Sequence, residues 1–114
     1  MIVSVVGLGY IGLPTAAVLA SSSLNVIGLD LNQKTVDIIN QGKIHIVEPE
    51  LDVLVHSAVQ SGYLKATTKP EKADVFIIAV PTPFKNNHKP DLSYIESAVN
   101  AIAPVLEKGN MVIL

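Results

Sequence analysis

The stretch VSVVGLGYIG, residues 3–12, decides the fold of this chain. An apolar run leads into three glycines with the spacing G-x-G-x-x-G, and a helical pattern follows them. The next apolar run along the chain ends in an acidic residue, Asp30. A strand, a glycine-rich turn, a helix, a second strand and a terminal acid in this order predict a βαβ unit of the mononucleotide-binding type.

Four residues of this unit have predicted roles in binding a dinucleotide. Gly7 permits a tight turn out of the first strand, and Gly9 lets the backbone approach a pyrophosphate. Gly12 lets the following helix pack closely on the sheet, and the N-terminus of that helix offers free N–H groups to phosphates. Asp30 would accept hydrogen bonds from ribose hydroxyls. Because glycine triplets also occur in ordinary turns, a purely structural turn and a different adenosine ligand stay open as alternatives.

The composition narrows the class of protein. The chain has 114 residues, which is enough for one domain with a core and too few for two. Apolar residues make up 49% and aromatic residues 4%, a composition typical of buried parallel strands flanked by helices. A net charge of −2 gives no electrostatic reason to expect nucleic acid or an anionic membrane as a partner. All basic residues are lysines, so no guanidinium is available for the 2′-phosphate of NADP.

Several kinds of site are excluded by what the sequence lacks. Cysteine is absent, which rules out disulfides and thiolate chemistry within this chain. The histidines, His45, His56 and His88, match no metal-binding spacing, so we predict no metal site. We expect His56 to lie on the surface of a helix. No apolar run approaches the ~18 residues that span a bilayer, and no signal-peptide pattern precedes the first strand. We therefore expect a soluble, cytoplasmic protein.

The remaining patterns predict alternating strands and helices. Strands are expected at residues 2–6, 26–29, 64–67, 75–80 and 111–114. One helix is expected at about residues 10–22, a second between an Asn32 cap and Gly42, a third from Pro49 or Glu50 to before Gly62, and a fourth capped by Asp91. We expect Glu50 to cap its helix and complement the helix dipole rather than to serve in acid–base chemistry.

This order predicts an α/β fold, a Rossmann-like, doubly wound parallel sheet of about five strands with the first strand at its centre. An ending on a bare apolar strand would leave an unprotected edge. We therefore expect residues 1–114 to be an incomplete N-terminal domain of a longer enzyme, truncated after the fifth strand.

A second candidate site follows the predicted strand at residues 75–80. Pro81 and Pro83 prevent the strand from continuing, and Thr82 lies between them. This is the carboxyl end of a strand, where open α/β sheets bind their ligands, so we expect a functional role for Thr82. Tyr10 is either a core residue or a neighbour of the cofactor, and its place inside the glycine motif favours the second.

Together these motifs resemble the UDP-glucose/GDP-mannose dehydrogenase family at its N-terminal NAD-binding domain. The resemblance is carried by GLGYIGLP at residues 7–14, by Asp30, by Glu48-Pro49 and by VPTP at residues 80–83. Within that family, residues 44–49 and 81–91 look most like the UDP-N-acetyl-D-mannosamine dehydrogenases. The resemblance covers essentially the whole chain.

The resemblance implies an NAD-dependent, four-electron oxidation of the 6-hydroxyl of a nucleotide sugar to a carboxylate, for surface polysaccharide biosynthesis. Tyr10 and Ile11 would offer backbone N–H groups to the pyrophosphate. Asp30 would hold the adenosine ribose, and Pro81, Thr82 and Pro83 would lie near the cofactor. Many members carry a basic residue at the place that Thr35 occupies here, with Lys34 adjacent, and neither is assigned to the site.

The resemblance also places the catalytic residues and most of the UDP-sugar-binding surface beyond Leu114, so no residue of this chain is assigned a catalytic role. It further implies that the full-length protein is a homodimer. The alternatives are a UDP-glucose or GDP-mannose dehydrogenase, another dehydrogenase such as a 3-hydroxy acid or 6-phosphogluconate enzyme, and a nucleotide-sensing regulatory domain like those that gate potassium channels. The VPTP segment at residues 80–83 and the loop at residues 89–91 favour the sugar-nucleotide enzymes over the sensing domains.

Overall fold

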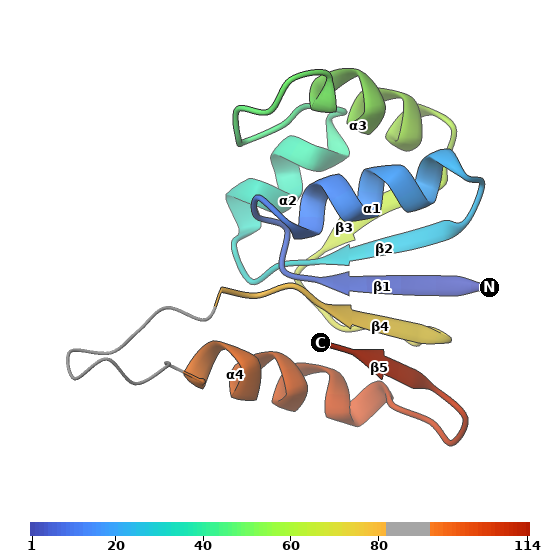
Figure 1. Ribbon diagram of the computed structural model, residues 1–114, viewed down its shortest axis with the longest axis vertical. Helices are drawn as coiled ribbons and strands as arrows, with labels where there is room; N and C mark the ends of the chain where they lie inside the picture. The colour runs from blue at the N-terminus through green and yellow to red at the C-terminus, as the bar shows by residue number, and fades with distance from the viewer. Residues whose placement is uncertain (82–91) are drawn as a thin grey trace.

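A computed structural model describes residues 1–81 and 92–114. Across these residues the strands form one parallel sheet in the order β3-β2-β1-β4-β5, with β1 at its centre (Figure 1). The strands are β1 (Ile2–Val6), β2 (Asn25–Leu29), β3 (Leu64–Thr67), β4 (Val75–Ile78) and β5 (Met111–Ile113). The predicted fold class and the central place of the first strand are both confirmed.

The helices cover both faces of the sheet, as the doubly wound prediction requires. Figure 1 shows α1, α2 and α3 on one face and α4 alone on the other. The helices are α1 (Gly12–Ser21), α2 (Gln33–Asn40), α3 (Leu51–Gln60) and α4 (Ser93–Ile102), with a 3-10 turn at Ala103–Val105. No helix within the described residues is long and apolar enough to cross a membrane.

The central strand β1 supplies side chains to a separate core on each face. Val3 and Val5 are buried beneath α1, α2 and α3, whereas Val6 is buried on the α4 side. Successive residues of a strand point to opposite faces, so an unbroken β-branched run fills both cores at once. Phe76 of β4 is the largest fully buried side chain, and it belongs to the α4 core.

The helix caps agree only partly with the predictions. Asn32 caps α2 as expected, because its side-chain oxygen accepts from the N–H groups of Lys34 (3.0 Å) and Thr35 (3.4 Å). The predicted cap by Glu50 is wrong: α3 begins at Leu51, and the Glu50 side chain makes no capping hydrogen bond. Glu50 has φ +65°, whereas a capping residue normally has an extended backbone that directs its side chain to the first free N–H groups.

Two other boundaries differ from the sequence prediction. β4 ends at Ile78 rather than residue 80, and the last hydrogen bond of its ladder runs from the Ala79 N–H to the Val6 carbonyl (2.8 Å). The backbone then leaves the sheet ahead of Pro81, which has no N–H to pair. The predicted cap Asp91 lies outside the described residues, and α4 begins at Ser93 with Leu92 as its N-cap.

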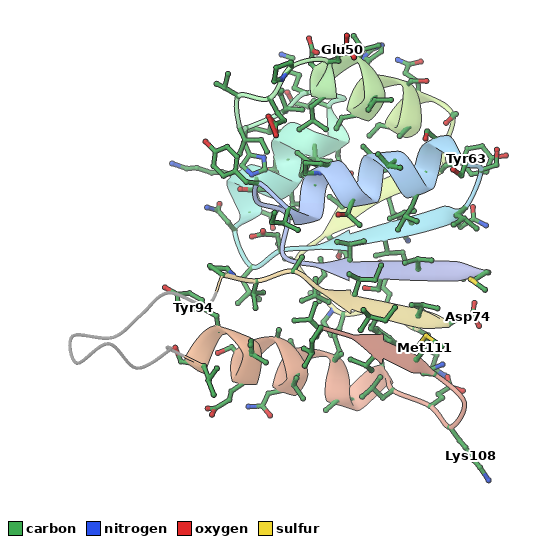
Figure 2. The ribbon with its side chains drawn as sticks, viewed as in Figure 1. Glu50, Tyr63, Asp74, Tyr94, Lys108 and Met111 are labelled. Carbon is green, nitrogen blue, oxygen red and sulfur yellow. The ribbon has the colours of Figure 1, made fainter. Side chains whose placement is uncertain are left out.

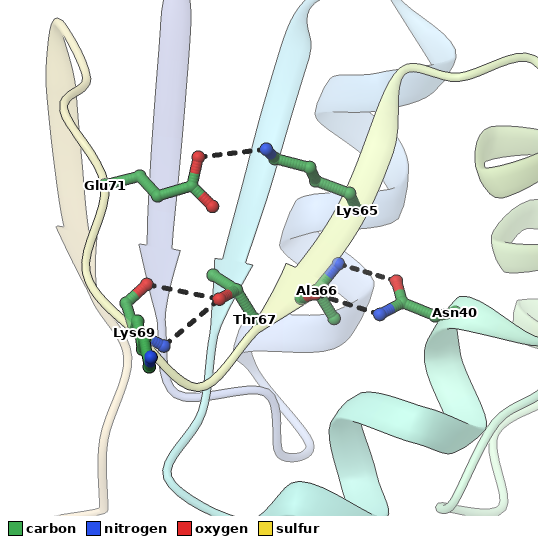
Figure 3. A network of polar contacts seen from close by, with 6 residues as sticks. All are labelled: Asn40, Lys65, Ala66, Thr67, Lys69 and Glu71. Atoms are coloured by element: carbon green, nitrogen blue, oxygen red, sulfur yellow. Dashed lines mark hydrogen bonds and ion pairs between the residues drawn. The ribbon is translucent and has the colours of Figure 1, made fainter.

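At the β3 edge of the sheet, a side chain pairs with the backbone of one residue (Figure 3). The amide of Asn40, the last residue of α2, donates from Nδ2 to the carbonyl of Ala66 (2.9 Å). Its Oδ1 accepts from the Ala66 N–H (2.8 Å). Asn40 thus pairs with edge strand β3 as a neighbouring strand would. Lys65 and Glu71 form an exposed ion pair beside this contact (2.9 Å).

Candidate dinucleotide-binding site

The turn after β1 requires glycine at its first position. Gly7 has φ +96°, and a Cβ there would lie 2.9 Å from the carbonyl oxygen of Ala79. Its N–H donates to the carbonyl of Leu29 at the end of β2 (2.8 Å). The chain therefore turns sharply between the ends of β2 and β4, as predicted for Gly7.

The other two glycines have different surroundings. A Cβ on Gly12 would overlap the carbonyl oxygen of Gly7, so the close approach is between helix α1 and its own glycine turn rather than the flat face of the sheet. A Cβ on Gly9 would meet nothing within 4 Å. Gly9 thus leaves open space next to the backbone, which is what a bound pyrophosphate needs.

Backbone amides at the start of α1 are available to an anion. Among the described residues, the N–H groups of Tyr10 and Ile11 have no acceptor. Ile11 is the N-cap of α1 and no side chain caps the helix, while the first turn contains no acidic residue that would offset its positive end. Unpaired N–H groups and the helix dipole together favour a phosphate at this position.

Asp30 links the end of β2 to the glycine turn. Its Oδ2 accepts from the Leu8 N–H (3.0 Å), and its Oδ1 accepts from the Asn32 N–H (2.9 Å). A carboxylate has about four lone-pair positions, so both oxygens keep capacity for a ribose hydroxyl. Asp30 therefore stabilises the turn through these two hydrogen bonds and can still accept a hydrogen bond from a ligand.

These groups surround one cavity of about 580 Å³ at the carboxyl ends of the strands. Gly7, Gly9, Tyr10, Ile11, Asp30 and Pro81 all line it, together with Val6, Leu8, Leu29, Leu31, Asn32, Ala79 and Val80. Of the other residues predicted for the site, Gly12 lies behind the glycine turn, and Thr82 and Pro83 are outside the described residues. The side chain of Tyr10 is 66% exposed, so Tyr10 is not a core residue.

Helix α4 contributes a wall of the cavity that was not predicted from the sequence. Tyr94, Ser97, Ala98 and Ala101 line the same cavity. These residues are three or four positions apart, so the sequence pattern alone indicates that they share one face of the helix. Nothing local in the sequence indicated which stripe of the helix faces the cavity.

Neither His45 nor His56, the histidines within the described residues, belongs to a cluster that could hold a metal ion. His56 is exposed on α3, as predicted. The Nδ1 atom of His45 is buried, and no partner for it is found among the described residues. No cluster of His, Asp or Glu in residues 1–81 and 92–114 is arranged to hold a metal ion.

A parallel doubly wound sheet, a glycine turn with free amides and an acid at the end of β2 define a dinucleotide-binding domain. The sequence matches the NAD binding domain of the UDP-glucose/GDP-mannose dehydrogenase family over residues 1–114, and the chain belongs to this family. NAD is therefore the cofactor of the domain.

Curated relatives agree with this family. The chain is 71% identical over 113 residues to UDP-N-acetyl-D-mannosamine dehydrogenase of Campylobacter jejuni, covering 98% of this chain and 28% of the relative. It is 69% identical over 112 residues to NDP-N-acetyl-D-galactosaminuronic acid dehydrogenase of Ralstonia nicotianae, covering 98% of this chain and 26% of the relative.

A solved structure has the same fold. The UDP-N-acetyl-mannosamine dehydrogenase of Staphylococcus aureus superposes with a TM-score of 0.95 at 45% identity, covering 98% of this chain and 28% of that protein. The chain thus spans little more than a quarter of the length of the proteins it matches.

Proposed function

We propose that this chain is the NAD-binding part of a dehydrogenase that oxidises UDP-N-acetylmannosamine to its uronic acid. The observation that carries the proposal is the cavity in which the unpaired amides of Tyr10 and Ile11 and the carboxylate of Asp30 meet. The amides suit the pyrophosphate of NAD, and the carboxylate suits the ribose of its adenosine half. The glycine turn and Asp30 would hold NAD, which would supply the hydride acceptor for the two successive oxidations of the sugar carbon.

The chain's own residues serve binding rather than bond breaking in this proposal. The glycine turn and α1 hold the phosphates, and Asp30 fixes the turn as well as the ribose. The catalytic groups and the UDP-sugar site would belong to polypeptide that corresponds to the rest of the relatives' length. We further propose that the complete protein is a homodimer, which sedimentation analysis of the complete protein would test.

The identity of the sugar is the least constrained part of the proposal. Relatives whose names contain N-acetyl-D-mannosamine and N-acetyl-D-galactosaminuronic acid are almost equally identical to this chain, at 71% and 69%. A domain that holds only the cofactor has no reason to differ between these substrates. UDP-glucose and GDP-mannose are the alternatives, and NADH formation by the complete enzyme with UDP-N-acetylmannosamine, UDP-glucose and GDP-mannose would decide among them.

The cofactor site is tested by titrating the chain with NAD and NADP in a calorimeter. Asp30 repels a 2′-phosphate and the chain has no arginine to receive one. We expect NAD to bind more tightly by about ten-fold, which corresponds to about 1.4 kcal/mol. Equal affinity, or tighter binding of NADP, would contradict the assigned role of Asp30.

Replacing Asp30 should weaken NAD binding directly. Asp30→Ala removes the ribose acceptor and also the acceptor for the Leu8 N–H, so we expect a loss of about 1–3 kcal/mol in binding free energy. Asp37→Ala is the matched control, because Asp37 is an exposed acid on α2 outside the cavity. If both variants bind NAD like the unchanged chain, Asp30 does not contact the cofactor.

A further inference from the structure

Three consecutive residues, at and just after the end of β2, hold the glycine turn in place. The carbonyl of Leu29 accepts from the Gly7 N–H (2.8 Å), and the carboxylate of Asp30 accepts from the Leu8 N–H (3.0 Å). The third contact is apolar and joins the side chain of Leu8 to Gly28. The turn is therefore fixed to β2 as well as to β1, the strand that leads into it.

The side chain of Leu8 fills a gap that Gly28 leaves in the sheet. In the strand register Gly28 lies between Val5 of β1 and Ala66 of β3, so these positions share one face of the sheet. A Cβ on Gly28 would lie 2.9 Å from both Cδ atoms of Leu8, whereas packed carbon atoms are about 3.5–4.0 Å apart. Leu8 is 1% exposed and belongs to the same core as Val5 and Ala66. Its isobutyl group thus occupies the space that a side chain at position 28 would take.

The position of Leu8 determines where the free amides of the turn lie. Tyr10 and Ile11, whose N–H groups have no acceptor among the described residues, follow Leu8 by two and three residues. Gly9, which comes between, has no side chain to hold the backbone. Leu8 also lines the cavity. A shift of its side chain away from β2 would therefore either move the turn or place apolar atoms where the phosphates are expected.

We propose that Leu8 and Gly28 are positioning residues for the pyrophosphate of NAD. Contact between them holds the glycine turn where the free amides of Tyr10 and Ile11 reach the phosphates. The inference rests on the proposed cofactor function, and it assigns a role to two residues for which the G-x-G-x-x-G spacing predicts none. Gly28 acts through Leu8, and Leu8 acts through the backbone that follows it.

Exchanging the sizes of the two side chains tests this contact. Gly28→Val adds three carbon atoms beside Leu8, and Leu8→Ala removes three, so the two substitutions disturb the contact in opposite directions. The double variant Leu8→Ala/Gly28→Val restores the total volume, with the bulk on β2 instead of on the turn. Gly28→Ala and Leu8→Val are milder forms of the same changes, for use if either single variant is unfolded.

Titrations with adenosine and with ADP, followed by amide NMR, separate the pyrophosphate from the rest of the ligand. Both ligands contain the ribose and the base, so the ratio of their affinities measures what the pyrophosphate contributes. We expect the preference for ADP to fall about ten-fold in each single variant, the scale of one hydrogen bond to a charged group. In the double variant it should return to within about two-fold of the unchanged chain. Adenosine affinity should change little throughout.

A core deletion elsewhere controls for the loss of stability. Leu64 of β3 is 2% exposed and belongs to the same core, but it does not line the cavity. It follows Tyr63, which Figure 2 shows at the opposite end of the molecule from Tyr94, a residue of the cavity wall. We expect Leu64→Ala to lower the urea midpoint, as Leu8→Ala does, and to leave the preference for ADP unchanged. Circular dichroism verifies that each variant is folded.

The possible outcomes separate this inference from the function beneath it. A preference for ADP that falls in both single variants and recovers in the double variant supports the inference. An unchanged preference in the folded single variants overturns it while leaving the NAD site in place. A preference that stays low in the double variant, or falls equally in Leu64→Ala, also overturns it. If the folded, unchanged chain binds neither ADP nor NAD, the proposed function fails and this inference fails with it.

Discussion

Gly9 and Gly12 are separated by two residues, yet a methyl group added to each would meet opposite surroundings. At Gly12 it would overlap the carbonyl oxygen of Gly7, and at Gly9 it would meet no protein atom within 4 Å. Gly12, like Gly7, is therefore required by the fold, whereas Gly9 is required by the ligand. The G-x-G-x-x-G spacing predicts glycine at both positions, but it does not show which glycine the fold needs and which the ligand needs.

The two substitutions should consequently separate stability from binding. Gly9→Ala should leave the urea midpoint nearly unchanged and weaken NAD binding by about 1–3 kcal/mol, since the new methyl group occupies space beside the pyrophosphate. Gly12→Ala should lower the free energy of unfolding by about 3 kcal/mol or more, because the obstructing atom belongs to the backbone. A Gly12→Ala variant as stable as the unchanged chain would contradict the geometry of the turn.

Glu50 is a residue held in a conformation that its side chain does not favour. Its φ of +65° is in the left-handed region, and its side chain makes no capping hydrogen bond in return. Glu50→Gly should therefore raise the free energy of unfolding by about 1 kcal/mol. Glu48→Gly, in the same loop but without positive φ, should not stabilise the chain. Equal effects of the two substitutions on the urea midpoint would contradict this explanation.

At the scale of elements, a side chain of α2 pairs with the edge strand β3. Asn40 forms hydrogen bonds with both the N–H and the carbonyl of Ala66, so this residue of edge strand β3 has partners for both of its backbone groups (Figure 3). We expect Asn40→Ala to lower the free energy of unfolding by about 1–2 kcal/mol, the loss of two hydrogen bonds in a partly buried place. Asn100→Ala, on the exposed face of α4, should be neutral or slightly stabilising in the same denaturation experiment. An Asn40→Ala variant as stable as Asn100→Ala would show that the pairing contributes nothing.

The strands and the Asn32 cap were predictable from the sequence because each depends on a local pattern, and the central place of β1 was predictable from right-handed crossovers. The glycine motif and the acid at the end of β2 likewise predicted Gly7, Gly9, Tyr10 and Asp30, which all line the cavity. The Asn40 pairing was not predictable, since it joins residues far apart in sequence through a register that only the folded sheet defines. Tyr94 was missed for the same reason: its contribution depends on the rotation of α4 against the sheet.

At the scale of the whole molecule, the helices cover the sheet unevenly. On the α1 side, β4 and β5 place Val75 beside Met111 and Ile77 beside Ile113. Met111 is 58% exposed and Ile113 is 44% exposed, so this strip of the sheet has no helix over it within the described residues. Apolar strips of this kind promote association between molecules, especially beside an open strand edge.

The isolated chain should therefore associate as its concentration rises. Sedimentation velocity should show a rising average mass, and Ile113→Lys should reduce this association because it places a charge on the strip. Val53→Lys is the control, since Val53 is an exposed apolar residue of α3 and is not part of the strip. A monomer at every concentration, or the same association in both variants, would mean that the strip does not mediate contacts.

The central position of β1 also has a consequence for synthesis on the ribosome. The half-sheet β3-β2-β1, with α1, α2 and α3 over it, consists of consecutive sequence that is complete at Thr67. This half can assemble as it leaves the exit tunnel, with β1 still exposing the edge that β4 will occupy (Figure 1). At about 5–20 residues per second, translation delivers β4 on the order of one second later, so the nascent chain exposes its central strand only briefly.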